Sequence, residues 1–240
     1  MTIKIFPNYD ALSQQTADEI ISLVKQKPTA VICFASGSTP VGTCEWLVKK
    51  AKEQHIDFSQ TTFIGLDEWV SIPKENTGSC YYFQYHYLFT PLHLKTSQIF
   101  LFDGMAKNLE QRCKQMDTVI AAKGGIDIMI VGIGMNGHIG FNEPGVDFNL
   151  LSHVINLDKT TQTVGQKYFT DAMTLMQGIT LGLGHLMQTK KVILQANGIK
   201  KASVIKQTIQ GDVTTDMPAS ILQTHPNSFI YADAEAASLL

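Results

Sequence analysis

The feature that most constrains this chain is an alternation, from end to end, of short apolar runs with segments of helical periodicity. The runs are rich in β-forming residues and span residues 30–35, 62–66, 99–102, 126–131, 192–195 and 228–231. Continuous apolar runs of this length are typical of parallel strands covered on both faces. Between them, Ala17, Ile20, Ile21 and Val24 recur at helical spacing, as do Leu109, Cys113, Met116 and Ile120. The alternation predicts an α/β fold: one doubly wound, mostly parallel, Rossmann-like sheet with helices on both faces.

The organisation along the chain indicates one domain. There are 240 residues, with no internal repeat, low-complexity tract or Pro/Ser-rich linker. Hydrophobic residues make up 44% of the chain and charged residues 17%, which is a globular composition rather than a disordered one. We therefore expect a single domain over residues 1–240.

Net charge and the hydropathy pattern limit the classes of binding partner and the cellular compartment that we expect for this protein. Nineteen basic residues against twenty-one acidic ones give a net charge of −2, so neither a nucleic acid nor a membrane is an expected partner. No uncharged apolar run reaches the ~18 residues of a membrane span, and the first residues do not read as a signal peptide. Four scattered cysteines without a CxxC pair favour reduced thiols in a cytoplasmic protein. Because Arg112 is the single arginine, an anion site must depend mainly on lysines, hydroxyls and backbone N–H groups.

In a doubly wound sheet, ligands bind beyond the carboxyl ends of the strands, so the loops that follow strands are the informative ones. The first is Ser36-Gly37-Ser38-Thr39-Pro40, which lies between the run at 30–35 and a helix expected to begin near Val41. Glycine permits a tight turn there, and free N–H groups at a helix start favour a bound anion, typically phosphate. The alternative is an ordinary N-capped helix start without a ligand.

A pair of carboxylates follows the second apolar run. Asp67, Glu68 and Trp69 come directly after the run at 62–66, and we expect them in a loop. Two carboxylates at the carboxyl edge of a sheet, beside an aromatic ring, could include a general base. The alternative is a pair of solvated acids, one of which caps a neighbouring element.

The third loop, residues 132–145, carries the strongest signal. It reads GIGMNGHIGFNEPG, in which His138 precedes Glu143 by five residues among closely spaced glycines. Glycines at that density indicate positive φ angles or close backbone approach. A histidine and a carboxylate in one loop can form a hydrogen-bonded acid–base pair. No third ligand lies nearby at a recognised spacing, so we expect no metal site.

Together, the GSTP, LDEW and GIGMNGHIGFNEPG segments resemble the glucosamine-6-phosphate deaminase/isomerase family, and the similarity continues into MPASILQTHP near the C-terminus. It thus covers nearly the whole chain, and GHIGFNEP is its most specific element. The related 6-phosphogluconolactonases share the fold but have a different run in place of GFNEP. Within the family, the LDEW, AVICFASGSTP and KGGIDIMIVGIGMNGH stretches look closest to the galactosamine-6-phosphate isomerase branch.

The resemblance implies a 2-amino-2-deoxyhexose 6-phosphate as substrate and no cofactor. His138, positioned by Glu143, would assist ring opening, and Asp67 would move a proton from C2 to C1 before ammonia is lost. The family's phosphate-binding positions correspond to Gly37, Ser38 and Thr39 and to Lys201, which lies early in a helix expected to begin near Gly198.

Some positions depart from the family pattern. Asn136 stands where members carry Asp or Asn, and we expect it to orient His138. Family arginines are replaced by Gln162 and by Lys167, which can meet a phosphate only as a point charge. Both lie in a segment, about residues 147–177, that the resemblance identifies as a lid. Allosteric members of the family carry an arginine and a lysine that hold an effector phosphate. This chain has His153 and Ile155 at those positions, so we expect no allosteric site.

Two alternatives from other functional classes remain open on the sequence: a lactonase-type hydrolase, and a non-catalytic regulator that binds sugar phosphates. GFNEP and Asp67 argue against the first, and the intact Asp67, His138 and Glu143 against the second. The sequence does not fix the preferred C4 epimer, nor whether the protein is a monomer or a small homo-oligomer.

Overall fold

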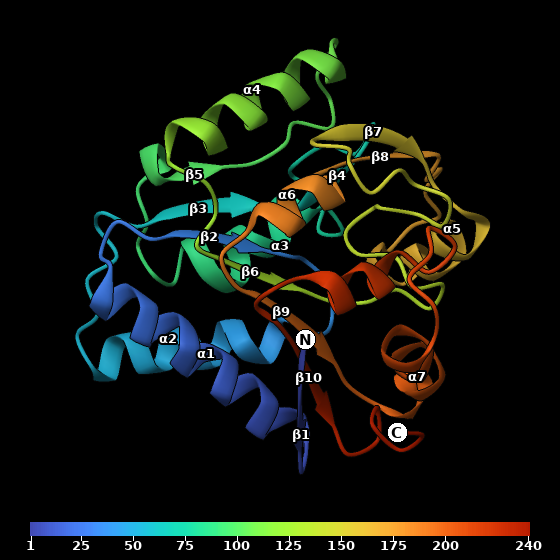
Figure 1. Cartoon of the computed structure of the whole chain (residues 1–240). Helices are drawn as coiled ribbons and strands as arrows, with labels where there is room; N and C mark the ends of the chain where they lie inside the picture. The colour runs from blue at the N-terminus through green and yellow to red at the C-terminus, as the bar shows by residue number, and fades with distance from the viewer.

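The computed structural model describes residues 1–240 and has a seven-stranded parallel sheet at its centre (Figure 1). Its strands, in spatial order, are β1 (Thr2–Phe6), β10 (Ser228–Asp233), β9 (Val192–Ala196), β6 (Ile128–Val131), β2 (Val31–Phe34), β3 (Thr62–Gly65) and β5 (Ile99–Phe100). Neighbouring strands pair in parallel throughout. All six predicted strands are present, and the predicted doubly wound α/β fold is confirmed.

Helices cover both faces of this sheet (Figure 1). The α-helices are α1 (Tyr9–Gln26), α2 (Val41–Glu53), α3 (Cys80–Gln84), α4 (Leu109–Ala122), α5 (Lys159–Gly165), α6 (Leu183–Gln188) and α7 (Ala202–Gln210). Shorter helical turns are η1 (Tyr85–Phe89, a π-helix), η2 (Thr96–Gln98), η3 (Gln166–Tyr168), η4 (Ile199–Lys201) and η5 (Pro218–Thr224). The predicted helices around Ala17–Val24, Leu109–Ile120 and Val41 are thus confirmed as α1, α4 and α2.

Two hydrophobic cores lie on the two faces of the sheet because successive side chains of a strand point to opposite sides. In β2, Ile32 and Phe34 join the core that contains residues of α1 and α2. Val31 and Cys33 join the core that contains residues of α4 and α6. All of β2 is buried, as the continuous apolar run predicted.

A second, smaller sheet was not predicted from the sequence. It contains β4 (Asp67–Trp69), β8 (Gln177–Thr180) and β7 (His153–Asn156), in that order and antiparallel. The expectation that Asp67 begins a loop is therefore wrong, because residues 67–69 pair with β8, with Glu68 opposite Ile179. This pairing fixes the direction of the Asp67 side chain more firmly than a loop would.

The order of the main sheet places a topological switch point between β2 and β6. From β2 the chain continues outward on one side through β3 and β5, and from β6 on the other side through β9 and β10. The loops that follow β2 and β6 therefore diverge at the carboxyl edge and leave a crevice between them. These are the loops that contain Gly37 and His138.

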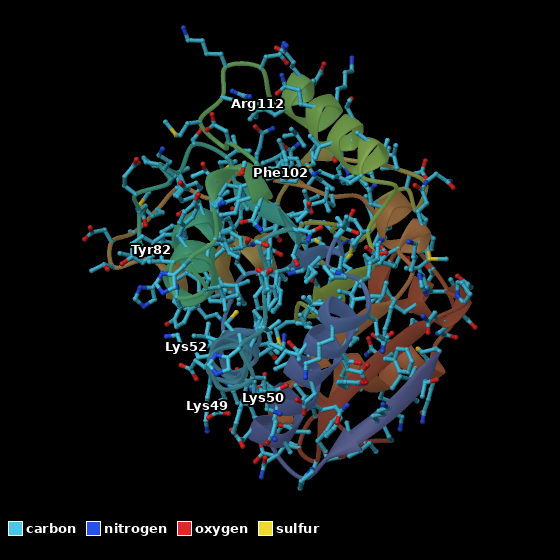
Figure 2. All side chains as sticks on the ribbon, turned by 90° about the vertical axis from the view of Figure 1, so that its left-hand side faces the viewer. Lys49, Lys50, Lys52, Tyr82, Phe102 and Arg112 are labelled. Carbon is cyan, nitrogen blue, oxygen red and sulfur yellow. The ribbon has the colours of Figure 1, made fainter.

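The remaining expectations concern thiols, arginine and membranes. All four cysteines are free and buried. Arg112 lies on α4 (Figure 2), where its guanidinium is 3.8 Å from the Asp103 carboxylate. No helix combines the length and the apolar character that crossing a bilayer demands.

Candidate active site

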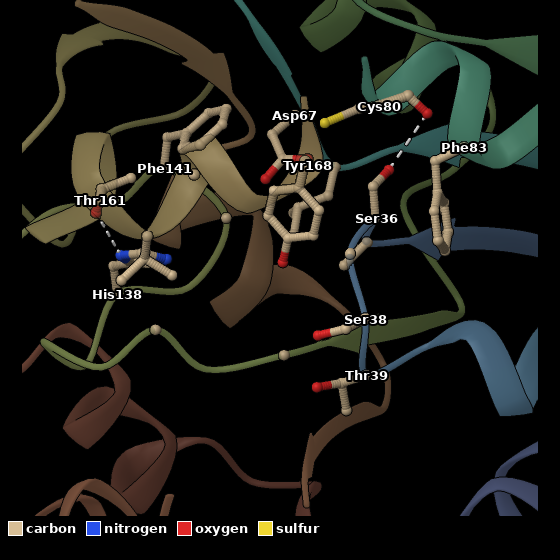
Figure 3. Close-up of a pocket in the computed structure, with 18 of the residues that line it drawn as sticks. Ser36, Ser38, Thr39, Asp67, Cys80, Phe83, His138, Phe141, Thr161 and Tyr168 are labelled. Atoms are coloured by element: carbon tan, nitrogen blue, oxygen red, sulfur yellow. Dashed lines mark hydrogen bonds between the residues drawn. The ribbon is translucent and has the colours of Figure 1, made fainter. Parts of the chain in front are cut away.

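A cavity of about 200 Å³ lies at the switch point, where the predicted motifs converge (Figure 3). Its walls come from the loops after β2 and β6, from β4, from the start of α3, from η4 and from the segment with α5 and η3. Of the predicted site residues, those that line it are Gly37, Ser38, Thr39, Asp67, His138, Lys167 and Lys201. Asn136 and Glu143 stand behind His138 and do not line the cavity.

The loop after β2 presents a glycine and two hydroxyl residues to the cavity. Gly37 has φ +114°, a conformation that L side chains rarely adopt, which explains glycine at this position. The Tyr9 hydroxyl donates a hydrogen bond to the Thr39 carbonyl (2.7 Å) and accepts one from the Gly42 amide (2.8 Å), which fixes the start of α2. No side chain caps α2, so the alternative of an ordinary N-capped helix is not supported.

Two lysines approach the same cavity. The Lys201 ammonium donates a hydrogen bond to the Ile133 carbonyl, which orients it. Burial, and to a smaller extent the positive charge of Lys167, lower the pKa of Lys201 to about 8. Mutual repulsion of two ammonium groups is relieved when an anion binds between them. The pair, together with the loop at Gly37, therefore has the character of an anion site without arginine.

Asp67 faces the cavity from β4. One of its carboxylate oxygens, Oδ1, is buried without a hydrogen-bond partner. The pKa of Asp67 is raised to about 7, mainly by burial and then by the negative charge of Glu68, whereas the Cys80 thiol beside it has a smaller lowering effect. A carboxylate whose pKa is close to neutral can both accept and return a proton.

Glu68 has a different task from its neighbour. Its carboxylate accepts hydrogen bonds from the amides of Trp69 (2.9 Å), Cys80 (2.9 Å) and Tyr81 (2.8 Å). Two of these amides belong to the first turn of α3, where free N–H groups favour a negative charge. The two carboxylates therefore have different surroundings. Glu68 accepts hydrogen bonds from the start of α3, and Asp67 lines the cavity.

His138 and Glu143 form the predicted pair, with 3.4 Å between His138 Nδ1 and Glu143 Oε2. Burial by itself would raise the pKa of Glu143, but hydrogen bonding to His138 and the charge of that ring lower it. The Thr161 hydroxyl lies 3.0 Å from the same Nδ1 atom. These contacts engage Nδ1, and the other ring nitrogen is directed toward the cavity (Figure 3).

Asn136 acts on this pair through Glu143. Its side-chain amide donates a hydrogen bond to Glu143 Oε2 (2.9 Å), and its Oδ1 accepts one from the His138 backbone N–H (3.3 Å). That Asn136 orients His138 stays a prediction, and its contacts with Glu143 and with the His138 backbone, rather than with the ring, are the route by which it would act. Gly134 leaves room for the imidazole, because a Cβ atom at Gly134 would lie 2.4 Å from the His138 ring.

Several cavity residues were missed from the sequence. Thr161 and Tyr168 lie in the predicted segment 147–177, and Tyr168 directly follows Lys167, but neither lies in a loop that follows a predicted strand. Cys80 and Phe83 come from α3, whose position depends on the amide contacts of Glu68. Gln162 does not line the cavity, and its side-chain amide instead donates to the Leu157 carbonyl (2.8 Å).

No group of three or more His, Cys, Asp or Glu side chains is placed so that it could hold a metal ion. The polar groups of the cavity are those of an anion site beside a carboxylate and an imidazole. This arrangement fits a small phosphorylated molecule that undergoes proton transfer.

Comparisons with known proteins agree with this description. A family model described as glucosamine-6-phosphate isomerases/6-phosphogluconolactonase matches residues 8–231. A glucosamine-6-phosphate deaminase of Thermoanaerobacter pseudethanolicus is 38% identical over 241 aligned positions, covering all of this chain and 95% of the relative. One from Clostridium botulinum (strain Eklund 17B / Type B) is 39% identical, covering all of this chain and 97% of the relative.

Solved structures give the same answer. A monomeric glucosamine-6-phosphate deaminase superposes with a TM-score of 0.97 at 32% identity, and each chain covers the other completely. A 6-phosphogluconolactonase from Thermotoga maritima has a TM-score of 0.77 at 16% identity over 97% of this chain and 99% of that one, a likeness of fold alone. The protein therefore belongs to the glucosamine-6-phosphate isomerase/6-phosphogluconolactonase family, as its motifs and the geometry of its cavity indicated.

Proposed function

We propose that this protein is an amino-sugar-phosphate deaminase/isomerase that converts glucosamine 6-phosphate and water to a ketose 6-phosphate and ammonia. The observation that carries the proposal is the position of Asp67, a carboxylate with its pKa near neutral, in one cavity with His138 and a cationic anion site. Relatives that match the full chain at 38–39% identity are named for this activity.

Each step of the reaction has a residue suited to it. His138, held by Glu143, Asn136 and Thr161, moves a proton between the ring oxygen and the C1 hydroxyl and opens the sugar ring. Asp67 then removes the C2 proton and returns it to C1 through an enediol-type intermediate. Water replaces the nitrogen at C2, which leaves as ammonia, and the ketose remains.

The phosphate group is assigned to the opposite end of the cavity. Amides and hydroxyls of Gly37, Ser38 and Thr39 supply neutral donors, and Lys167 and Lys201 supply charge. The lowered pKa of Lys201 supports this assignment, since a dianion between the two ammonium groups would offset their repulsion.

Residues 147–177 are proposed to act as a lid within a single domain of residues 1–240. Residues of α5 and η3 in this segment form part of the cavity wall, among them Thr161 and Lys167. Closure of such a segment would exclude water from Asp67 and sustain its raised pKa.

The decisive test of function is ammonia release. The purified protein is mixed with glucosamine 6-phosphate, and ammonia and ketose 6-phosphate are measured together, with 6-phosphogluconolactone as the control substrate. We expect the two products in equal amounts and no lactone hydrolysis. Lactone hydrolysis without ammonia would indicate the hydrolase alternative, and binding without turnover would indicate a non-catalytic regulator.

The preference between C4 epimers is a separate, finer proposal. The LDEW and AVICFASGSTP stretches and Lys167 support a modest preference for galactosamine 6-phosphate, whereas the matching relatives carry the name of the gluco epimer. Gln162, at which the chain also departs from the family pattern, does not line the cavity and so adds no support to this preference. Values of kcat/KM for both epimers, measured side by side, decide it, and a clear advantage for glucosamine 6-phosphate would refute the galactosamine preference.

A further inference from the structure

Tyr168 is a cavity residue that neither the motifs nor the reaction above accounts for. It lies in η3, next to Lys167, and its ring forms part of the cavity wall. The residue that follows, Phe169, is buried against Trp69, with ring centroids 5.8 Å apart. Gly78 makes room for this arrangement, because a Cβ atom there would lie 2.4 Å from the Phe169 ring and 2.7 Å from the Tyr168 carbonyl oxygen. The backbone at Tyr168 is therefore held firmly against the main body of the protein.

The hydroxyl of Tyr168 reaches the loop that follows β2. A Cβ atom built on Gly37 would lie 3.0 Å from this hydroxyl oxygen, so no other side chain comes as close to that point of the loop. Figure 3 shows the hydroxyl directed into the open part of the cavity, on the side of Ser38. The Lys167 ammonium lies 4.8 Å from the centroid of the Tyr168 ring, so a positive charge and a phenolic hydroxyl lie side by side at this wall of the cavity.

We propose that the Tyr168 hydroxyl donates a hydrogen bond to the phosphate group of the substrate and completes the anion site from the lid side. The inference rests on the proposed function, which supplies the phosphate. A phenolic O–H is a neutral donor, and its bond to a dianion is charge-assisted and stronger than a neutral one. The single arginine, Arg112, does not line the cavity, so a bidentate guanidinium contact is absent and a neutral donor such as this hydroxyl can supplement the lysines.

The substitution Tyr168→Phe isolates the hydroxyl. The phenyl ring retains its packing and its contact with the Lys167 ammonium, while the donor is lost. Tyr82→Phe is the matched control, since Tyr82 is an exposed residue of α3 that does not line the cavity (Figure 2). The probe is inorganic phosphate, whose dissociation constant is measured by calorimetry and, independently, as a competitive inhibition constant against glucosamine 6-phosphate.

We expect Tyr168→Phe to weaken phosphate binding about tenfold, the usual effect of losing one hydrogen bond to a charged group, and Tyr82→Phe to leave it unchanged. KM for glucosamine 6-phosphate should rise by a similar factor while kcat changes little, because the contact is made before and during the reaction. Equal phosphate affinity in the wild type and Tyr168→Phe would overturn this assignment and leave the proposed function intact. A wild-type protein that neither binds phosphate nor releases ammonia would contradict both.

Discussion

Asp67 owes its chemical character to its surroundings. Its Oδ1 atom is buried without a partner, and burial together with the charge of Glu68 raises its pKa to about 7. The base must be deprotonated to accept the C2 proton, so activity should be lost as the pH falls through this value. We expect kcat to decrease below about pH 7, reaching a tenfold loss per pH unit.

The check is a profile of kcat against pH from 5 to 8, with Asp103→Asn as the control because Asp103 is an exposed acid outside the cavity. The control should reproduce the wild-type profile. A kcat that stays constant down to pH 5 would mean that the base has an ordinary carboxylate pKa, and the argument from burial would be wrong.

Lys201 leads to a prediction on the alkaline side. Burial and the charge of Lys167 lower its pKa to about 8, so the free protein loses this positive charge as the pH rises through that value. We expect KM for the phosphorylated sugar to rise above pH 8. Lys201→Ala should raise KM about tenfold at pH 7 and remove most of its further increase at alkaline pH.

Lys200→Ala is the matched control, because Lys200 is the adjacent lysine, is exposed and does not line the cavity. Its KM should stay at the wild-type value throughout. An unchanged KM in Lys201→Ala would remove Lys201 from the phosphate site.

Among the elements, the segment with α5 and η3 depends on close contact with the loop before α3. A methyl group at Gly78 would collide with the Phe169 ring and with the Tyr168 carbonyl, which lies on the backbone and cannot rotate away. Gly78→Ala should therefore push this segment outward and lower kcat/KM about 10²-fold, since displacements near 1 Å have effects of that size.

Urea unfolding of the Gly78→Ala variant measures how much the substitution lowers the free energy of unfolding of the whole protein. We expect a loss of roughly 1–3 kcal/mol in the free energy of unfolding, typical of local overpacking, with the main sheet intact. A kcat/KM equal to that of the wild type would show that the position of the segment does not matter for turnover.

The strands that could be predicted from the sequence are those whose burial is visible in their composition. The six apolar runs all form strands of the main sheet, and all but the edge strand β5 are largely buried on both faces. β1 escaped prediction because it is an edge strand in which Ile3 and Ile5 are exposed. β4 and β7 were missed because they are short and acquire strand geometry only through pairing with β8.

The candidate site, too, contains residues that could be predicted from the sequence and residues that could not. His138, Glu143 and Asp67 were predicted because glycine-rich or acidic stretches directly follow strands, and the structure gathers them at one edge of the sheet. Neither Thr161 nor Tyr168 lies in a glycine-rich or acidic stretch that directly follows a strand. Their proximity to His138 and Gly37 depends on how the segment 147–177 folds back over the sheet, which only tertiary packing determines.

At the scale of the whole molecule, residues from distant parts of the sequence line one cavity. The switch point between β2 and β6 brings the anion loop and the His138 loop together, and the small sheet adds Asp67. We predict that a single copy of the chain is active, because its own residues supply the proposed base, the histidine and the anion site. Light scattering should give a mass near 26.5 kDa, and specific activity should not fall on dilution to nanomolar concentrations. Activity that declines with dilution would contradict a self-sufficient monomer.

The most direct test of the account is the fate of the C2 proton. Glucosamine 6-phosphate is converted in heavy water, and deuterium at C1 of the ketose is measured by NMR for the wild type, Asp67→Asn and His138→Gln. Asp67→Asn retains the size of the side chain but not its basicity, so it should bind substrate and lose ~10²–10⁴-fold both in kcat and in the rate at which deuterium enters C1. His138→Gln should slow ring opening yet still deuterate C1 of substrate that has opened unaided. Normal turnover and normal C1 deuteration in Asp67→Asn would contradict the central claim that Asp67 is the base.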